Sequence, residues 1–198
     1  RKALADFRQR TIAAGFPDLH LNAVIWGVQI LPGEQTIKDP NSLLAALGFQ
    51  SVTSYVWVHH VPLRPFPQAA YAAVGAEMET FWEQAERDFT LPYYPNVTMG
   101  WDASPRTNQN GPFVDTGYPY TPVLEGNTPE AFEGALRTAR AFLARQAPNN
   151  RILTINAWNE WTEGSYLEPD TVHGMRYLEA IRKVFGPKRE QGSEQHAP

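Results

Sequence analysis

Short apolar runs alternate with longer amphipathic segments along most of the chain. Four apolar runs have the length and the β-branched and aromatic content of strands, at residues 19–26, 51–59, 96–102 and 151–158. Apolar residues at helical spacing predict helices over residues 1–14, 41–48, 68–89, 128–146 and 172–185. Because strands and helices alternate four times after an opening helix, the pattern predicts an α/β fold with a parallel sheet.

Turn and capping residues mark the ends of these segments. Thr128, Pro129 and Glu130 form an N-cap, a first-turn proline and an acidic first turn. A loop rich in Pro, Gly and Asn covers residues 103–127. Gly186 and Pro187 end the last helix. We therefore expect one domain over residues 1–187 and a disordered tail over 188–198.

Alternation within the strands helps to choose between two parallel architectures. In each strand one phase is aliphatic and the other is polar or aromatic, as in Leu153, Ile155 and Ala157 against Thr154, Asn156, Trp158 and Glu160. Strands of an open doubly wound sheet are covered on both faces and are apolar in both phases. A barrel strand turns one face to its helices and the other to the interior and mouth. The pattern favours a (β/α)8 TIM-type barrel, although a doubly wound sheet remains an alternative.

Four βα units make only half of such a barrel, so the chain is expected to be the C-terminal half. A half-barrel leaves two sheet edges unpaired. The expected partner is the missing N-terminal half-barrel or a second copy of the chain. The sequence does not begin with methionine, which is consistent with a start inside a longer protein.

Composition removes several functional classes. The formal net charge of the 198 residues is -4 and the basic residues are scattered, which does not suggest a nucleic-acid partner. There is no apolar run long enough for a membrane span. Cysteine is absent, which excludes disulfides and thiolate metal sites but leaves the compartment open.

Charged and aromatic side chains collect at the predicted carboxyl ends of the strands, where the working residues of parallel βα folds lie. Glu160 and Glu163 follow the fourth strand, in the stretch INAWNEWTEGSYLEPD. A desolvated carboxyl and an ionised one can divide into acid and base, as glycosidic bond cleavage requires. Aromatic faces suit the C–H faces of sugars. We therefore expect Glu160 and Glu163 to be catalytic and the substrate to be a carbohydrate.

The expected sugar-binding residues are those that share these strand ends. They are Tyr55, Trp57, His59, His60, Trp101, Asp102, Arg106, Trp158, Asn159, Trp161, Tyr166 and Glu168.

Structural explanations compete with several of these assignments. Asp102 and Arg106 are also consistent with an ion pair that orders a loop, and Trp26 and Trp57 with core packing. His59, His60 and His173 could ligate a metal with Asp102 or Glu160, but adjacent residues of a strand, such as His59 and His60, point to opposite faces. No metal or other cofactor is therefore expected.

Two segments resemble a known superfamily. NAWNEWTEGSYLEPD…HGMRYLEAI, preceded by PNVTMGWDASPR, is similar to the C-terminal motifs of glycoside hydrolase family 99-like proteins, which include endo-α-mannosidases and the related WbsX-type proteins of polysaccharide biosynthesis. The resemblance covers residues 95–185 well. It implies a (β/α)8 barrel and metal-free catalysis with Glu160 as general base and Glu163 as general acid. It also implies an epoxide-like intermediate formed by the sugar 2-hydroxyl, with net retention.

The motif departs from the hydrolases at one position. Thr162 stands where the hydrolases have histidine, and the preceding Ala157 and Trp158 are typical of the WbsX-like branch. The leading hypothesis is a hydrolase of an α-linked, mannose-like polysaccharide or oligosaccharide, which would be secreted or periplasmic. The alternatives are a cytoplasmic glycosyltransferase-type protein of lipopolysaccharide or surface polysaccharide assembly, and a non-catalytic carbohydrate-binding fragment.

Overall fold

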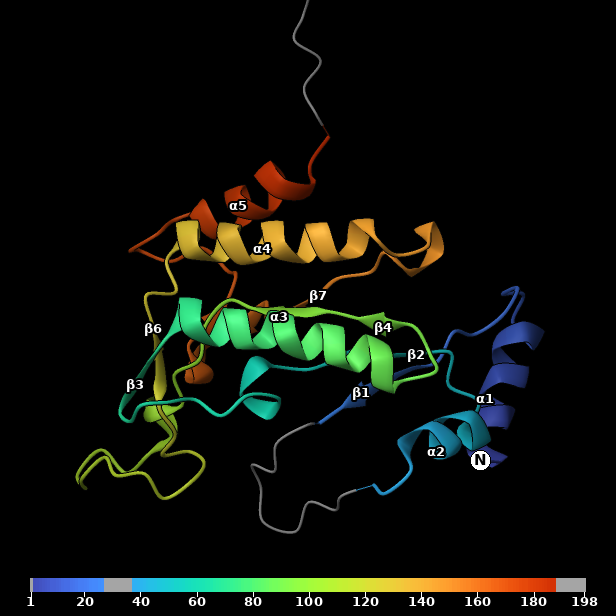
Figure 1. Ribbon diagram of the computed structural model, residues 1–198, viewed down its shortest axis with the longest axis horizontal. Helices are drawn as coiled ribbons and strands as arrows, with labels where there is room; N and C mark the ends of the chain where they lie inside the picture. Colours follow the sequence, from blue (N-terminus) through green and yellow to red (C-terminus); the bar gives the residue numbers. More distant parts are fainter. Residues whose placement is uncertain (1, 27–36, 188–198) are drawn as a thin grey trace, which may run out of the picture.

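The computed structural model describes residues 2–26 and 37–187 as an α/β arrangement of short strands and covering helices (Figure 1). Helix α3 lies across the strands, and α4 and α5 are stacked beside it. None of the helices in the described ranges is both long and apolar enough to cross a bilayer. The predicted disordered tail, residues 188–198, lies outside the described residues.

The helices form where the apolar spacing predicts them. They are α1 (Lys2–Ala13), α2 (Pro40–Leu47), α3 (Tyr71–Asp88), α4 (Pro129–Ala144) and α5 (Arg176–Phe185). Side-chain caps start two of them, because Asp39 accepts the N–H of Ser42 and Thr128 accepts the N–H of Ala131. The predicted N-cap at Thr128 is thus confirmed.

The strands run parallel and in chain order. Strand β1 (Asn22–Ile25) pairs with β2 (Ser51–Ser54), and β2 pairs with β4 (Tyr93–Tyr94). After Pro95 the chain continues as β5 (Asn96–Thr98), which pairs with β7 (Thr154–Asn156). Within the described residues β1 and β7 each pair with one strand only, so both outer edges of the array are open.

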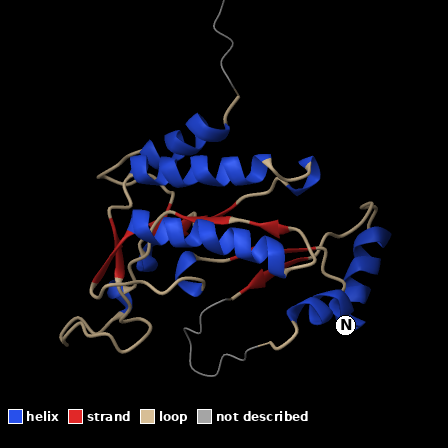
Figure 2. Cartoon of the chain, in the orientation of Figure 1, coloured by secondary structure: helices blue, strands red, loops and turns tan. Residues whose placement is uncertain are grey.

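Two smaller two-stranded ribbons are separate from this array (Figure 2). Strand β3 (Gln68–Ala70) pairs in parallel with β6 (Val123–Glu125), and β8 (Asn159–Glu160) forms an antiparallel hairpin with β9 (Ser165–Tyr166). Four 3-10 turns lie in the connections of the described chain: η1 (Trp57–His59), η2 (Ser104–Arg106), η3 (Pro148–Asn150) and η4 (Trp161–Glu163).

The two faces of the strands differ as the alternation predicts. Val52 and Val97 belong to the apolar core that Met78, Trp82 and Leu136 of the helices complete. The neighbouring positions face the other way. Here the hydroxyls of Thr53 and Thr154 lie 3.2 Å apart, and the Asn96 amide donates to Thr154 at 3.1 Å. One face is therefore sealed by helices and the other is a layer of hydroxyl and amide groups.

Several element predictions were wrong in part. The helix expected over 172–185 begins only at Arg176, and the strands expected over 96–102 and 151–158 cover only Asn96–Thr98 and Thr154–Asn156. The strand expected over 51–59 ends at Ser54, and the chain turns into η1 because Trp57 donates its backbone N–H to Thr98 and its indole N–H to Asn96. The helix expected from residue 68 begins at Tyr71, because the preceding three residues pair with β6. At η1 and at the start of α3 a distant partner outweighs local propensity.

Candidate active site

Glu160 and Glu163 lie on one short hairpin directly after β7. Glu160 ends β8, and Glu163 ends the 3-10 turn that connects β8 to β9. The Ser165 hydroxyl donates to the backbone and side-chain oxygens of Asn156 at 3.0 and 2.6 Å. A cis peptide bond joins Asn156 to Ala157 at the same junction. The hairpin is thus fastened to the carboxyl end of the strand, as the position of the motif predicts.

Arg106, from the loop after β5, joins the two glutamates. Its Nε donates to Thr162 Oγ1 at 2.9 Å, and Nη2 donates to Thr162 at 2.7 Å and to Glu160 Oε1 at 2.5 Å. Nη1 donates to Glu163 Oε1 at 2.7 Å and to the Tyr118 hydroxyl. A guanidinium has five N–H groups, and these bonds engage all of them.

The two carboxylates have unequal surroundings. The Glu163 side chain is only 9% exposed, whereas that of Glu160 is 35% exposed. Burial raises the pKa of Glu163, against the lowering effect of Arg106, and the charge of Glu160 raises it further. Tyr118 donates a hydrogen bond to Glu163 at 3.2 Å, which lowers that pKa. Glu163 is therefore the carboxyl of the pair that is better suited to carry a proton.

Asp102 supports the hairpin rather than pairing with Arg106. Its backbone N–H donates to the carbonyl of Glu163 at 2.6 Å, and its carboxylate accepts the N–H of Ser104 at 2.9 Å. Within the described ranges no ion pair joins Asp102 to Arg106. The alternative of a structural Asp102–Arg106 pair is therefore wrong.

Aromatic side chains flank the hairpin. Trp161 stacks on Tyr166, and its indole N–H donates to Glu168 at 2.6 Å. Trp161 is 45% exposed, and Trp158 is 54% exposed. Asn159, also exposed, pairs with Tyr166 across the hairpin. These five predicted residues gather on the same hairpin and its following loop.

A second aromatic group lies after β1 and β2. The rings of Trp26 and His59 are 3.6 Å apart, and Tyr55 lies 5.8 Å from His59. Burial raises the pKa of Tyr55, and the charges of Glu163 and Glu160 raise it further, so Tyr55 lies within reach of the carboxylate pair. The second strand end thus contributes Tyr55 to the neighbourhood of the glutamates.

Four of the residues predicted to bind sugar are buried: Trp57, His59, His60 and Trp101. Trp57 is fully buried and stacks on Tyr71, so the expectation that its ring contacts sugar is corrected to the core-packing alternative. Trp101 is buried and donates its indole N–H to Thr121. His60 is also buried, and burial lowers its pKa to about 3, with a further contribution from His59.

Sequence analysis missed three members of this neighbourhood. Tyr118 lies in a loop without periodicity, and no local signal places its hydroxyl beside Glu163. The sequence marks Thr162 only as a departure from the hydrolase motif, although its hydroxyl accepts two hydrogen bonds from Arg106. Trp26, for which the sequence is consistent with core packing, is half-exposed and lies against His59. Of these three residues, Trp26 alone could have been predicted from its position, because it stands at the carboxyl end of a predicted strand.

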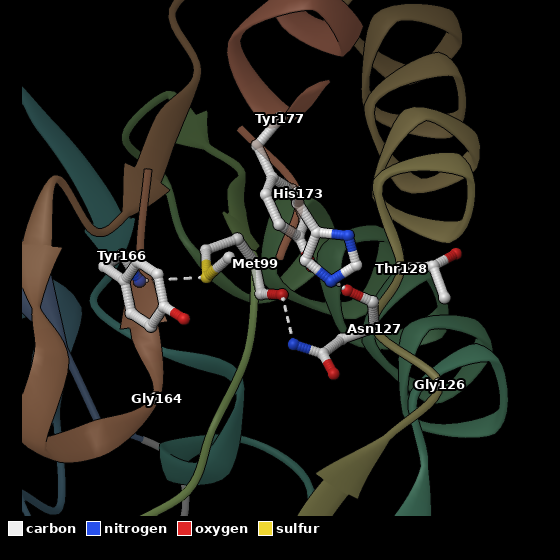
Figure 3. A pocket seen from close by; sticks show the side chains of 8 residues that line it. All are labelled: Met99, Gly126, Asn127, Thr128, Gly164, Tyr166, His173 and Tyr177. Carbon is white, nitrogen blue, oxygen red and sulfur yellow. Dashed lines mark hydrogen bonds between the residues drawn. The ribbon is translucent and has the colours of Figure 1, made fainter. Parts of the chain in front are cut away.

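A cavity of about 250 Å³ lies beside the hairpin, between the ends of the strands and the first turns of α4 and α5 (Figure 3). It is lined by Met99, Gly126, Asn127, Thr128, Gly164, Tyr166, His173 and Tyr177. Asn127 donates to the carbonyl of Met99 at 3.1 Å, and Tyr166 donates its backbone N–H to the Met99 sulfur at 2.9 Å. The cavity shares Tyr166 with the aromatic pair of the hairpin.

The three histidines considered as metal ligands, His59, His60 and His173, pack against three different aromatic rings. His59 packs against Trp26, His60 against Phe81 and His173 against Tyr177. In the part of the chain that the structure describes, no three His, Asp or Glu side chains form a group that could hold a metal ion.

The arginine bridges a buried and a half-buried carboxylate beside exposed aromatic rings, and such a site is suited to carbohydrate chemistry. The sequence profile of the family described as Glycosyltransferase WbsX matches residues 3–181, so the chain belongs to this family. The family suggests a carbohydrate-active enzyme. The match supports the WbsX side of the expected resemblance, and the relation to glycoside hydrolase family 99 stays a prediction.

Two curated relatives carry the name Uncharacterized protein WxcX. They come from Xanthomonas campestris pv. campestris strains B100 and ATCC 33913, and each is 36% identical over 99 residues. The match covers 50% of this chain and 13% of each relative. No solved structure matches the chain.

Proposed function

We propose that the protein is a glycoside hydrolase that cleaves an α-linked, mannose-like glycan, with Glu163 as general acid and Glu160 as general base. The unequal burial of the two carboxyl groups is the observation that carries this proposal. An acid must hold a proton near neutral pH and a base must be ionised, and unequal desolvation separates these states.

The chemistry can proceed without a bond between protein and sugar. Glu160 takes the proton of the sugar 2-hydroxyl, whose oxygen bonds to the anomeric carbon as the bond to the leaving sugar breaks. Glu163 gives its proton to the leaving oxygen. In the second step Glu163 takes a proton from water, the water oxygen bonds to the anomeric carbon as the bond between that carbon and the 2-oxygen breaks, and Glu160 returns its proton to the 2-oxygen. The result is hydrolysis with net retention.

The closeness of the pair supports this route over direct inversion. One guanidinium bonds an oxygen of each carboxylate, at 2.5 and 2.7 Å. Inverting glycosidases keep their carboxyl groups about 6.5–9.5 Å apart to admit a water, whereas retaining enzymes use about 5–5.5 Å. Two carboxyl groups bridged by a single arginine side chain favour the shorter separation, which is that of retaining enzymes.

We also propose that the four βα units are half of a (β/α)8 barrel. Neighbouring strands follow one another in chain order, whereas doubly wound sheets reverse their order at a switch point. The open edges at β1 and β7 would be closed by an N-terminal half-barrel or a second copy. Trp26, Tyr55 and the hairpin then lie at one mouth.

The test compares single substitutions in the pair. Glu163→Gln and Glu160→Gln should each reduce the release of reducing ends from α-mannan oligosaccharides by at least about a hundredfold. Glu79→Gln, on the exposed face of α3, is the matched control and should keep full activity. Wild-type rates in both site variants would end the hydrolase proposal.

A transferase of polysaccharide assembly is the second candidate, and the family description favours it. It predicts binding of a nucleotide sugar. Calorimetry with GDP-mannose and UDP-sugars would detect such binding at micromolar to millimolar affinity. Binding together with transfer to an acceptor glycan, in the absence of hydrolysis, would replace the hydrolase proposal.

A further inference from the structure

Arg106 is fully occupied by the protein itself. All five of its N–H groups are donated to Thr162, Glu160, Glu163 and Tyr118 within the described structure. A sugar hydroxyl would have to displace one of these bonds, two of which are made to carboxylates. The contact pattern differs from the sugar-binding role expected from its place after the third strand.

We infer that Arg106 is a positioning residue that fixes Glu160 and Glu163 relative to each other, and that Thr162 holds the guanidinium in the required orientation. This inference rests on the proposed function. It deepens that proposal by assigning tasks to two residues that do not need to touch the sugar.

The rigid fork of the Arg106 guanidinium holds the two carboxylates at a fixed spacing. Nη1 and Nη2 belong to one plane, and each bonds a different carboxylate, so their spacing sets the spacing of the two Oε1 atoms. Glu163 Oε1 accepts from both Arg106 and Tyr118. A proton on Oε1 would compete with these two N–H and O–H donors for the same oxygen. The transferable proton of Glu163 therefore belongs on Oε2.

Thr162 fixes the orientation of the Arg106 guanidinium. Its hydroxyl accepts from Nε and Nη2, which lie on the same edge of the guanidinium, and lies 3.4 Å from Glu160 Oε1. Without these two hydrogen bonds the guanidinium could rotate about the bonds of the Arg106 side chain. Nη1 and Nη2 would then no longer reach both carboxylates together. Thr162 thus acts on the acid and base through Arg106.

Several charged or titratable groups face Glu163 and must be considered in a titration. Arg106 comes from η2, Tyr118 from the following loop, Glu160 from β8 and Tyr55 from the segment after β2. Among these, Arg106 favours the ionised form of Glu163, while Glu160 disfavours it. If Arg106 moves away, Glu163 loses the positive charge that favours its ionised form and keeps the negative charge of Glu160 nearby, so its pKa rises.

The experiment measures the Glu163 carboxyl directly, by ¹³C NMR titration of the protein without substrate. Glu163→Gln identifies the signal. Thr162→Val, which removes the hydroxyl, should move the midpoint up by about one pH unit, whereas Thr162→Ser should leave it near the wild-type value. Circular dichroism and thermal unfolding of both variants check that the fold is intact. An unchanged midpoint in Thr162→Val would overturn the inference.

Kinetics provide the second measurement. Arg106→Lys keeps the charge but loses the fork, so it should reduce kcat on α-mannan oligosaccharides at least about tenfold with little change in KM. A rise in KM with unchanged kcat would show that Arg106 binds sugar, and would overturn the inference. Absence of cleavage by the wild-type protein would instead refute the hydrolase proposal, while the NMR result still decides whether Thr162 and Arg106 control Glu163.

Discussion

Trp161 lies flat on Tyr166, with ring centroids 3.7 Å apart and planes inclined by 14°. The indole N–H is also tied to Glu168 at 2.6 Å. One face of the indole packs on the Tyr166 ring, and the hydrogen bond to the Glu168 carboxylate fixes its edge. A sugar that packs on the remaining exposed surface would find it already oriented, two residues from Glu163.

Removing this surface should weaken glycan binding. Trp161→Ala should raise KM for α-mannan oligosaccharides about tenfold to a hundredfold, because burying an aromatic side chain against a ligand is worth about 1.5–3 kcal/mol. Trp161→Phe keeps a ring but loses the bond to Glu168, and should give a smaller rise. An unchanged KM in Trp161→Ala would show that the sugar does not pack there.

The pH profile should report the raised pKa of Glu163. A general acid works only while protonated, so activity should fall as pH rises through the Glu163 pKa, which lies above the ordinary value for glutamate. Tyr118→Phe removes a hydrogen bond that lowers this pKa, so the alkaline limb of kcat/KM should move to higher pH. Tyr120→Phe, in the same loop, is the control. A shift to lower pH in Tyr118→Phe would contradict the assignment of the acid.

The close approach of the hairpin to the loop after β5 depends on Gly164. Its φ is +59°, and a Cβ there would lie 2.8 Å from the Cβ of Asp102. Gly164→Ala should reduce the free energy of unfolding by at least about 1–2 kcal/mol and lower activity, because the adjacent Glu163 would shift.

A matched glycine separates this effect from substitution in general. A Cβ at Gly134 in α4 has open space around it, so Gly134→Ala should stabilise the helix by about 0.5–1 kcal/mol. Chemical denaturation of both variants measures the contrast. Equal stability changes would show that the close contact at Gly164 does not constrain the hairpin.

Trp57 and Trp158, both among the residues predicted to bind sugar, should respond differently to substitution. Trp57 is fully buried with its indole N–H bonded to Asn96, so Trp57→Ala should destabilise the protein by about 3–5 kcal/mol. Trp158 is more than half exposed, and Trp158→Ala should change stability by less than about 0.5 kcal/mol. Thermal unfolding compares the two, and a mild effect at Trp57 would mean that it is not a core residue.

Local sequence signals determined much of the helix and strand content. The cap at Thr128 and the apolar spacing of α3, α4 and α5 act within one helix, so they can be recognised without knowing the neighbours. The placement of Glu160 and Glu163 after a strand was equally accessible, because parallel βα folds put such positions at one rim.

The tertiary structure decided which of these residues meet and in what state. Arg106 reaches across more than fifty residues of sequence to the glutamates, and Tyr118 comes from a loop without periodicity. Burial of Trp57 and exposure of Trp161 depend on what packs above each ring, which no local pattern encodes. The sequence by itself determined the elements and the carboxylate motif, because these follow from short-range spacing. The difference in burial between the two carboxyl groups, on which the proposed acid and base roles depend, arises only when distant segments remove water from one of them.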